Sequence, residues 1–193
     1  MKAQTSLLMD FSVDKENKKI FVKREFAAPL SRVWAAWTER ELLDQWWAPK
    51  PWKAETKSLD FKEGGTWIYA MVSPEGEKHW SCAEFHSITP FISFSGKDGF
   101  CDEEGNIDHN MPVSVWSNEF QETGDTTTVF IAITYEKNED IDKILEMGFK
   151  EGLSAAMENL DELLGYSKKH GAWSKELGEQ NSDTRQNTEV GDR

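Results

Sequence analysis

The sequence predicts one α+β domain in which a curved antiparallel sheet wraps around a long C-terminal helix. Stretches of alternating apolar and polar residues follow one another between residues 18 and 135, separated by turn-forming residues. An amphipathic helical pattern then covers residues 138–164 and ends at Gly165. A long amphipathic helix needs a broad apolar surface, and an antiparallel sheet with one covered face supplies it.

The first predicted strand leads into two short helices. Apolar residues alternate from Ile20 to Phe26, and Pro29 then suits the first turn of a helix. Two runs with three- and four-residue spacing follow, over residues 29–37 and 39–47. Thr38 is a candidate N-cap for the second helix.

A meander of antiparallel strands comes next. Period-2 stretches and turn signals predict strands over residues 52–61, 66–72, 78–88, 91–94, 113–120 and 127–135. With the first strand, the sheet has about six to seven strands. Residues 98–110 are predicted to form a long acidic loop, and residues 122–125 a hairpin turn.

The C-terminal helix is predicted to be continuous. Asn138 can cap it, and about 27 residues at 1.5 Å per residue give roughly 40 Å. Gly148 and Gly152 place small residues where this helix crosses the sheet. They either leave room for a ligand or let the helix and sheet backbones approach closely.

Composition limits the partners. The 22 Lys and Arg against 35 Asp and Glu give a net charge of −13, which repels phosphate backbones and anionic lipids. Nucleic acid and membrane insertion are therefore not expected, and without an apolar run for export or spanning the expected location is cytoplasmic. Cys82 and Cys101 are expected to be reduced thiols, and no metal or cofactor motif is present.

The predicted organisation has three parts. Residues 1–17 form a short lead, residues 18–165 the folded domain, and residues 166–193 a polar, mobile tail.

Two segments carry a resemblance to a known family. Residues 37–49, which read WTERELLDQWWAP, and residues 60–67, DFKEGGTW, resemble motifs of the activator of heat-shock-protein-90 ATPase homologue-like family. The resemblance extends over residues 18–165, with Lys62 where the family usually has Arg and Phe149 where it usually has Trp. It implies the helix-grip fold of the START/Bet v-like (SRPBCC) superfamily, whose members hold apolar molecules in a cavity.

A ligand-binding domain is therefore the first functional hypothesis. An apolar or aromatic, lipid-like small molecule would bind between the sheet and the C-terminal helix. The predicted contact residues are Trp47, Trp67, Tyr69, Trp80, Phe94, Trp116, Phe149, Leu153 and Met157. The same aromatic residues could instead form a simple packed core.

Two alternatives stay open. The family name suggests a co-chaperone that activates a heat-shock-protein-90 ATPase in the stress response, although 17 residues before the domain leave no room for an additional domain. A cyclase- or hydrolase-type enzyme would need a cavity acid or base. The titratable candidates are Asp60, Tyr69, His79, Glu84 and His86. Without a nucleophile elbow, phosphate loop or metal motif, no catalytic residue is assigned.

Overall fold

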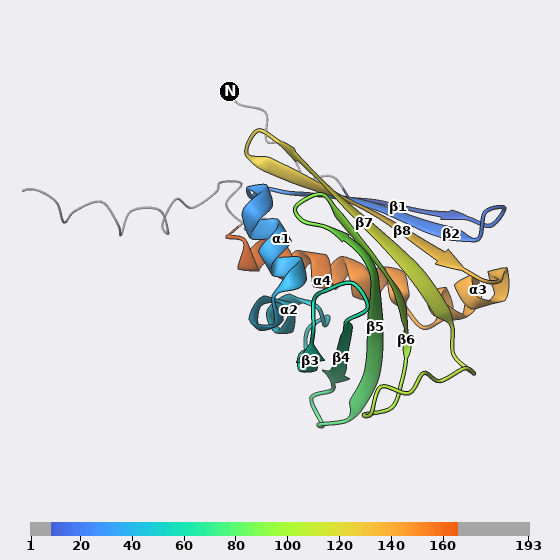
Figure 1. Ribbon diagram of the computed structural model, residues 1–193. Coiled ribbons are helices and arrows are strands. Elements are labelled where there is room, and N and C mark those ends of the chain that lie inside the picture. Colours follow the sequence, from blue (N-terminus) through green and yellow to red (C-terminus); the bar gives the residue numbers. More distant parts are fainter. Residues whose placement is uncertain (1–8, 166–193) are drawn as a thin grey trace, which may run out of the picture.

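The computed structural model describes residues 9–165 as an eight-stranded antiparallel sheet with four helices (Figure 1). The strands are β1 Met9–Asp14, β2 Lys19–Phe26, β3 Lys53–Leu59, β4 Thr66–Val72, β5 Lys78–Thr89, β6 Ser93–Phe100, β7 Val113–Thr123 and β8 Thr126–Tyr135. The helices are α1 Leu30–Thr38, α2 Arg40–Trp46, α3 Asn138–Glu146 and α4 Phe149–Leu163. The α+β helix-grip prediction is confirmed.

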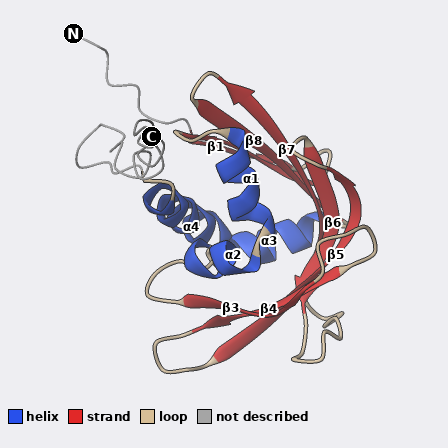
Figure 2. Cartoon of the chain, turned by 60° about the vertical axis from the view of Figure 1, so that its left-hand side comes forward, coloured by secondary structure: helices blue, strands red, loops and turns tan. Residues whose placement is uncertain are grey.

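The sheet is one continuous layer in the order β1-β2-β8-β7-β6-β5-β4-β3. Strands β3 to β8 form a meander, and the hairpin of β1 and β2 pairs with β8. Figure 2 shows the sheet as an arc with the helices on its concave side. The inner face of the sheet and the helices therefore enclose the core.

The sheet has more strand than predicted. Strand β1 lies within the first 17 residues, where the sequence predicted only a lead, so the strand count is eight rather than six to seven. Strand β6 runs on to Phe100, so Asp98 lies in a strand and not in the predicted acidic loop. Pairing with β5 on one side and β7 on the other holds this Gly- and Asp-containing segment extended.

The C-terminal helix is broken rather than continuous. Gly148 adopts a left-handed conformation with φ of 86° and separates α3 from α4. The predicted caps also differ. Glu39 and Lys137 occupy the N-cap positions, and the Thr38 hydroxyl donates to the Trp34 carbonyl inside α1.

Two polar contacts hold α4 in place. The Arg24 guanidinium on β2 forms a buried ion pair with Asp161 on α4, with side chains 5% and 6% exposed. The Asn159 amide donates to the Ala48 carbonyl at 2.9 Å, which ties α4 to the end of α2. The two contacts fix the helix relative to both the sheet and the short helices.

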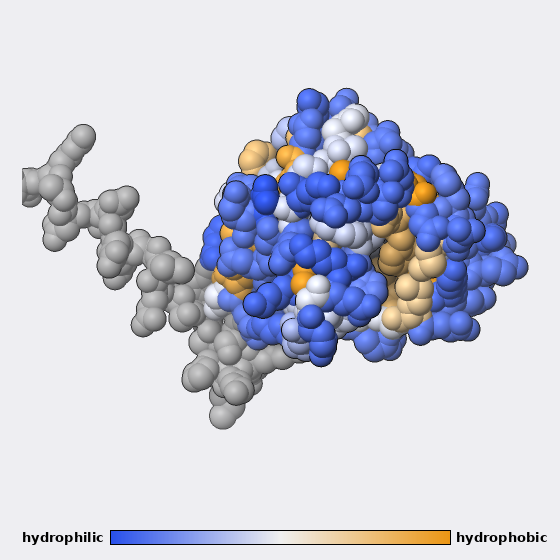
Figure 3. Space-filling model, turned by 90° about the horizontal axis from the view of Figure 1, so that it is seen from below, coloured by the Kyte–Doolittle hydropathy of each residue, from blue (hydrophilic) through white to orange (hydrophobic). Residues whose placement is uncertain are grey.

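The surface is mainly polar. Figure 3 shows a face of the molecule on which a narrow hydrophobic strip is framed by hydrophilic residues. Among the described residues 9–165, no helix is long and apolar enough to cross a membrane. Residues 166–193, the predicted tail, lie outside the described residues.

Candidate functional site

An apolar cavity lies between α4 and the sheet and has a volume of about 280 Å³. We call it the outer cavity. Strands β4 to β7 contribute one wall, and the end of α2, α3 and α4 contribute the other. Its lining includes Trp47, Pro49, Tyr69, Met71, His79, Ser81, Phe100, Trp116, Phe149, Gly152 and Leu153.

A smaller cavity of about 50 Å³ adjoins it, and we call it the inner cavity. Trp47 and Trp116 line both cavities, so the two meet at this pair of rings, whose centroids are 6.1 Å apart. The remaining lining comes from α1, α2, β4, β5, β6 and β7: Trp37, Leu43, Trp67, Ala83, Phe85, Phe94, Gly96, Asp98 and Asn118.

The tryptophans are positioned by the two short helices and the strands. Trp46 is fully buried and its indole N–H donates to the Ala36 carbonyl at 2.8 Å, so its neighbour Trp47 projects between the cavities. The Trp67 indole donates to Thr56 Oγ1 at 3.0 Å. The first bond holds the residue next to Trp47, and the second fixes the Trp67 ring in the wall of the inner cavity.

Most of the residues predicted to contact a ligand line one of the two cavities. Trp47, Tyr69, Trp116, Phe149 and Leu153 line the outer cavity, and Trp67 and Phe94 line the inner one.

Two predicted residues lie elsewhere. Trp80 is on the outer face of β5, where Lys57 and Lys78 lie over its ring, because the inward residues of this strand are His79, Ser81, Ala83 and Phe85. Met157 is fully buried in the core and lines neither cavity.

Asp98 is the residue that the sequence analysis missed. It faces inward from β6 into the inner cavity, and burial raises the pKa of its carboxyl to about 7. The residue is half-buried, so part of its surface stays accessible. The two-residue alternation of Phe94, Gly96 and Asp98 was the signal that could have found it.

The neighbouring titratable groups stay neutral. Burial first, and the negative charge of Asp98 second, raise the pKa values of Tyr69 and Tyr135. Burial also raises the pKa of Cys82, and that of Cys101 to about 12. Between pH 5 and 8 these phenols and thiols therefore carry no charge.

The predicted acid/base candidates are scattered. Tyr69 and His79 line the outer cavity, whereas Asp60, Glu84 and His86 are exposed away from it. Within residues 9–165, no group of three or more His, Cys, Asp or Glu side chains could hold a metal ion.

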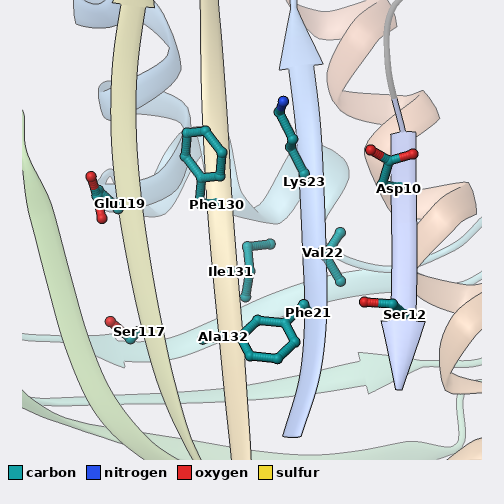
Figure 4. Close-up of a pocket in the computed structure, with 10 residues that line it drawn as sticks. All are labelled: Asp10, Ser12, Phe21, Val22, Lys23, Ser117, Glu119, Phe130, Ile131 and Ala132. Carbon is teal, nitrogen blue, oxygen red and sulfur yellow. The ribbon is translucent and has the colours of Figure 1, made fainter. Parts of the chain in front are cut away.

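A third depression, of about 290 Å³, lies on the opposite, solvent side of the sheet, over β1, β2, β7 and β8. Figure 4 shows Phe130 beside Lys23 there and Phe21 beside Ala132, with Asp10 and Glu119 at its edges. It has no covering helix among its lining elements. The cavities between the sheet and the helices are therefore the better candidate for a ligand site.

Proteins of known structure with a similar fold have been found. The protein Ms6760 of Mycobacterium smegmatis is 31% identical, with a TM-score of 0.76, and the match covers 84% of this chain and 99% of that one. A protein from Arthrobacter aurescens is also 31% identical, with a TM-score of 0.76 and coverage of 80% and 90%. The AHSA1 protein of Silicibacter pomeroyi, at 19% identity, has a TM-score of 0.62, with coverage of 76% and 96%, and shows the fold alone.

No curated protein matches the sequence. Residues 27–165 match the family described as activator of Hsp90 ATPase homolog 1-like protein. This span contains α1 to α4, strands β3 to β8, and every residue that lines the inner and outer cavities. The chain belongs to the activator of Hsp90 ATPase homolog 1-like family.

Proposed function

We propose that this protein binds an apolar or aromatic small molecule in the outer cavity. The observation that carries the proposal is an apolar cavity between sheet and helix, with a volume close to the lower end of the range of about 300–1,000 Å³ for small-molecule sites. Burial of apolar ligand surface would drive binding, at about 25 cal/mol per Å². The neutral Tyr69 hydroxyl would supply a hydrogen bond that orients the ligand.

Gly152 on α4 supports the proposal, because its missing side chain leaves space in the outer cavity. A Cβ atom added to Gly152 would meet only Pro49 Cγ, at 3.9 Å, which is an ordinary contact. A close approach of helix and sheet backbones therefore does not require glycine at this position. Glycine in a helix costs about 1 kcal/mol relative to alanine, so the space that it leaves in the cavity is the better reason for it.

A neutral aromatic probe tests the proposal. We expect 4-phenyl-1-butanol at about ten times its Kd to stabilise the protein by about 1.4 kcal/mol, which corresponds to a Tm rise of about 3–6 °C. Native mass spectrometry of protein purified from its natural host should show bound mass that is lost on denaturation.

A matched pair of variants locates the site. Gly152→Leu places a large side chain in the outer cavity and should abolish the Tm rise, whereas Glu151→Leu adds the same side chain at an exposed position and should keep it. If Gly152→Leu binds the probe as the unmodified protein does, or if neither the probe nor bound host mass is detected, the proposal fails.

The family description favours a second candidate, activation of an Hsp90 ATPase. An ATPase assay with Hsp90 from the same host measures it directly. A stimulation that Gly152→Leu leaves intact would show that the activity does not use the outer cavity.

A further inference from the structure

Two small residues on the sheet line the inner cavity. Ala83 on β5 and Gly96 on β6 line it beside Asp98, which pairs with Ala83 in the β5–β6 register. A Cβ on Gly96 would lie 2.6 Å from the Glu84 carbonyl oxygen, so only glycine fits there. The cavity volume of about 50 Å³ suits a polar head group of a few heavy atoms.

Asp98 gives this small cavity a specific chemistry. No residue of the described chain donates a hydrogen bond to its carboxylate, and burial alone accounts for the raised pKa. The amide oxygen of Asn118, a residue that is 3% exposed, also has no hydrogen-bond partner among residues 9–165. The indole N–H groups of Trp37 and Trp47, which line the same cavity, also have no hydrogen-bond partner among residues 9–165. The wall therefore offers both donors and acceptors, and the carboxylate of Asp98 is the feature that favours a ligand group with positive charge.

Aromatic rings complete the wall around the carboxylate. Trp47 contacts four other tryptophans, with a centroid distance of 5.1 Å to the core residue Trp46. The other three are Trp37 at 6.0 Å, Trp67 at 5.3 Å and Trp116 at 6.1 Å, and these three line the inner cavity together with Trp47 and Asp98. Indole faces attract organic cations through the quadrupole of the ring, and tryptophan does so most strongly.

We propose that the ligand is an organic cation whose protonated amine occupies the inner cavity against Asp98, while its apolar body fills the outer cavity. This inference rests on the proposed function, because the outer cavity must hold the body of the ligand. The continuity of the two cavities along Trp47 and Trp116 supports a single ligand that spans both. The net charge of −13 attracts cations and disfavours fatty-acid carboxylates.

Three probes with one carbon skeleton test the charge requirement by calorimetry. At pH 8 we expect 4-phenylbutylamine to bind about tenfold or more tightly than 4-phenyl-1-butanol, because a hydrogen bond between charged groups is worth at least that factor. The anion 4-phenylbutyrate should bind more weakly than the alcohol.

Proton release provides a second readout. At pH 6 the Asp98 carboxyl, with a pKa of about 7, is about 90% protonated, so binding of the amine should release about 0.9 proton. Titrations in buffers of different ionisation enthalpy measure this number. The alcohol should release none.

Two variants with the same change in net charge separate the site from the acidic surface. Asp98→Asn should reduce the preference for the amine to less than about threefold and abolish proton release. Glu84→Gln removes an exposed carboxylate from the neighbouring strand and should change neither. Because Asp98→Asn leaves His79 of the outer cavity in place, the comparison also excludes that residue as the source of the released proton.

The outcomes separate the two proposals. Equal binding of amine and alcohol overturns the cation inference and leaves the proposed function standing. A preference for the amine that persists in Asp98→Asn also overturns the inference, because the cation is then held elsewhere. If neither probe binds, the proposed function fails and the cation inference fails with it.

Discussion

Replacing Asp98 with asparagine should make the protein more stable at neutral pH, in the absence of any ligand. The change keeps the shape of the side chain and removes its ionisation. In the folded protein the pKa of this carboxyl is about 7, against 3.8 as the ordinary value of an aspartate. Between these two values the folded state binds more protons than the unfolded state, so the stability of the unmodified protein falls as pH rises.

The magnitude follows from the size of the pKa shift. One pKa unit corresponds to 1.36 kcal/mol, so a shift of about three units amounts to about 4 kcal/mol. The stability advantage of Asp98→Asn should therefore be absent near pH 4 and grow by about 1.4 kcal/mol per pH unit. It should level off at about 4 kcal/mol above pH 7.

Urea unfolding, followed by tryptophan fluorescence from pH 4 to pH 8, measures the difference between the two proteins. Taking the difference cancels the other titrating groups, which both proteins share. The Glu84→Gln control should stay within about 0.5 kcal/mol of the unmodified protein throughout, because its carboxylate is exposed. If the free energy of unfolding of Asp98→Asn and of the unmodified protein changes with pH in parallel, the reasoning is refuted. Ionisation of the Asp98 carboxyl would then carry no free-energy cost in the folded protein.

Three further changes have defined outcomes. Asp161→Ala should destabilise the protein by about 3–5 kcal/mol in urea unfolding, because it leaves the Arg24 charge buried without this carboxylate. A loss of stability under about 1 kcal/mol would contradict this reasoning. Gly152→Ala should raise the free energy of unfolding by about 1 kcal/mol through helix propensity, and a loss of stability would mean that the position is tightly packed after all. Cys82 and Cys101 should react with a thiol reagent at pH 8 far more slowly than a free cysteine does, because their raised pKa values keep the thiols protonated. Reaction rates equal to that of free cysteine would contradict this.

The parts of the fold that could be predicted are those in which local pattern and tertiary structure agree. Strand β2 buries alternate residues from Ile20 to Phe26, and the turn at Gly124 joins β7 to β8 as its hairpin signal indicates. Helix α4 buries Leu153, Ala156, Met157 and Leu160 on one face, as the amphipathic pattern predicts. Gly148 broke the expected helix because one glycine is compatible both with a helix interior and with a left-handed break, and the sequence does not choose between them.

The candidate site was harder to predict because it depends on strand phase and on pairing. Strand β5 carries apolar residues on both faces, with Trp80 and Cys82 outward and Ala83 and Phe85 inward, so alternation alone could not decide which set faces the core. Asp98 lies between two glycines, a composition typical of loops. Only pairing on both sides places it in a strand with its carboxylate under the helices.

Comparison with the buried Asp161 shows that the free-energy cost of ionising Asp98 is specific to its position. Asp161 is neutralised by Arg24, which reaches it across the core from β2. Asp98 has no such cation among residues 9–165, and no nearby positive charge lowers its pKa. A carboxylate that costs stability at neutral pH, in the wall of a cavity, is typical of a site shaped for binding rather than for packing. A bound amine would supply for Asp98 the charge that Arg24 supplies for Asp161, and on that basis the cation is the ligand class best matched to this core.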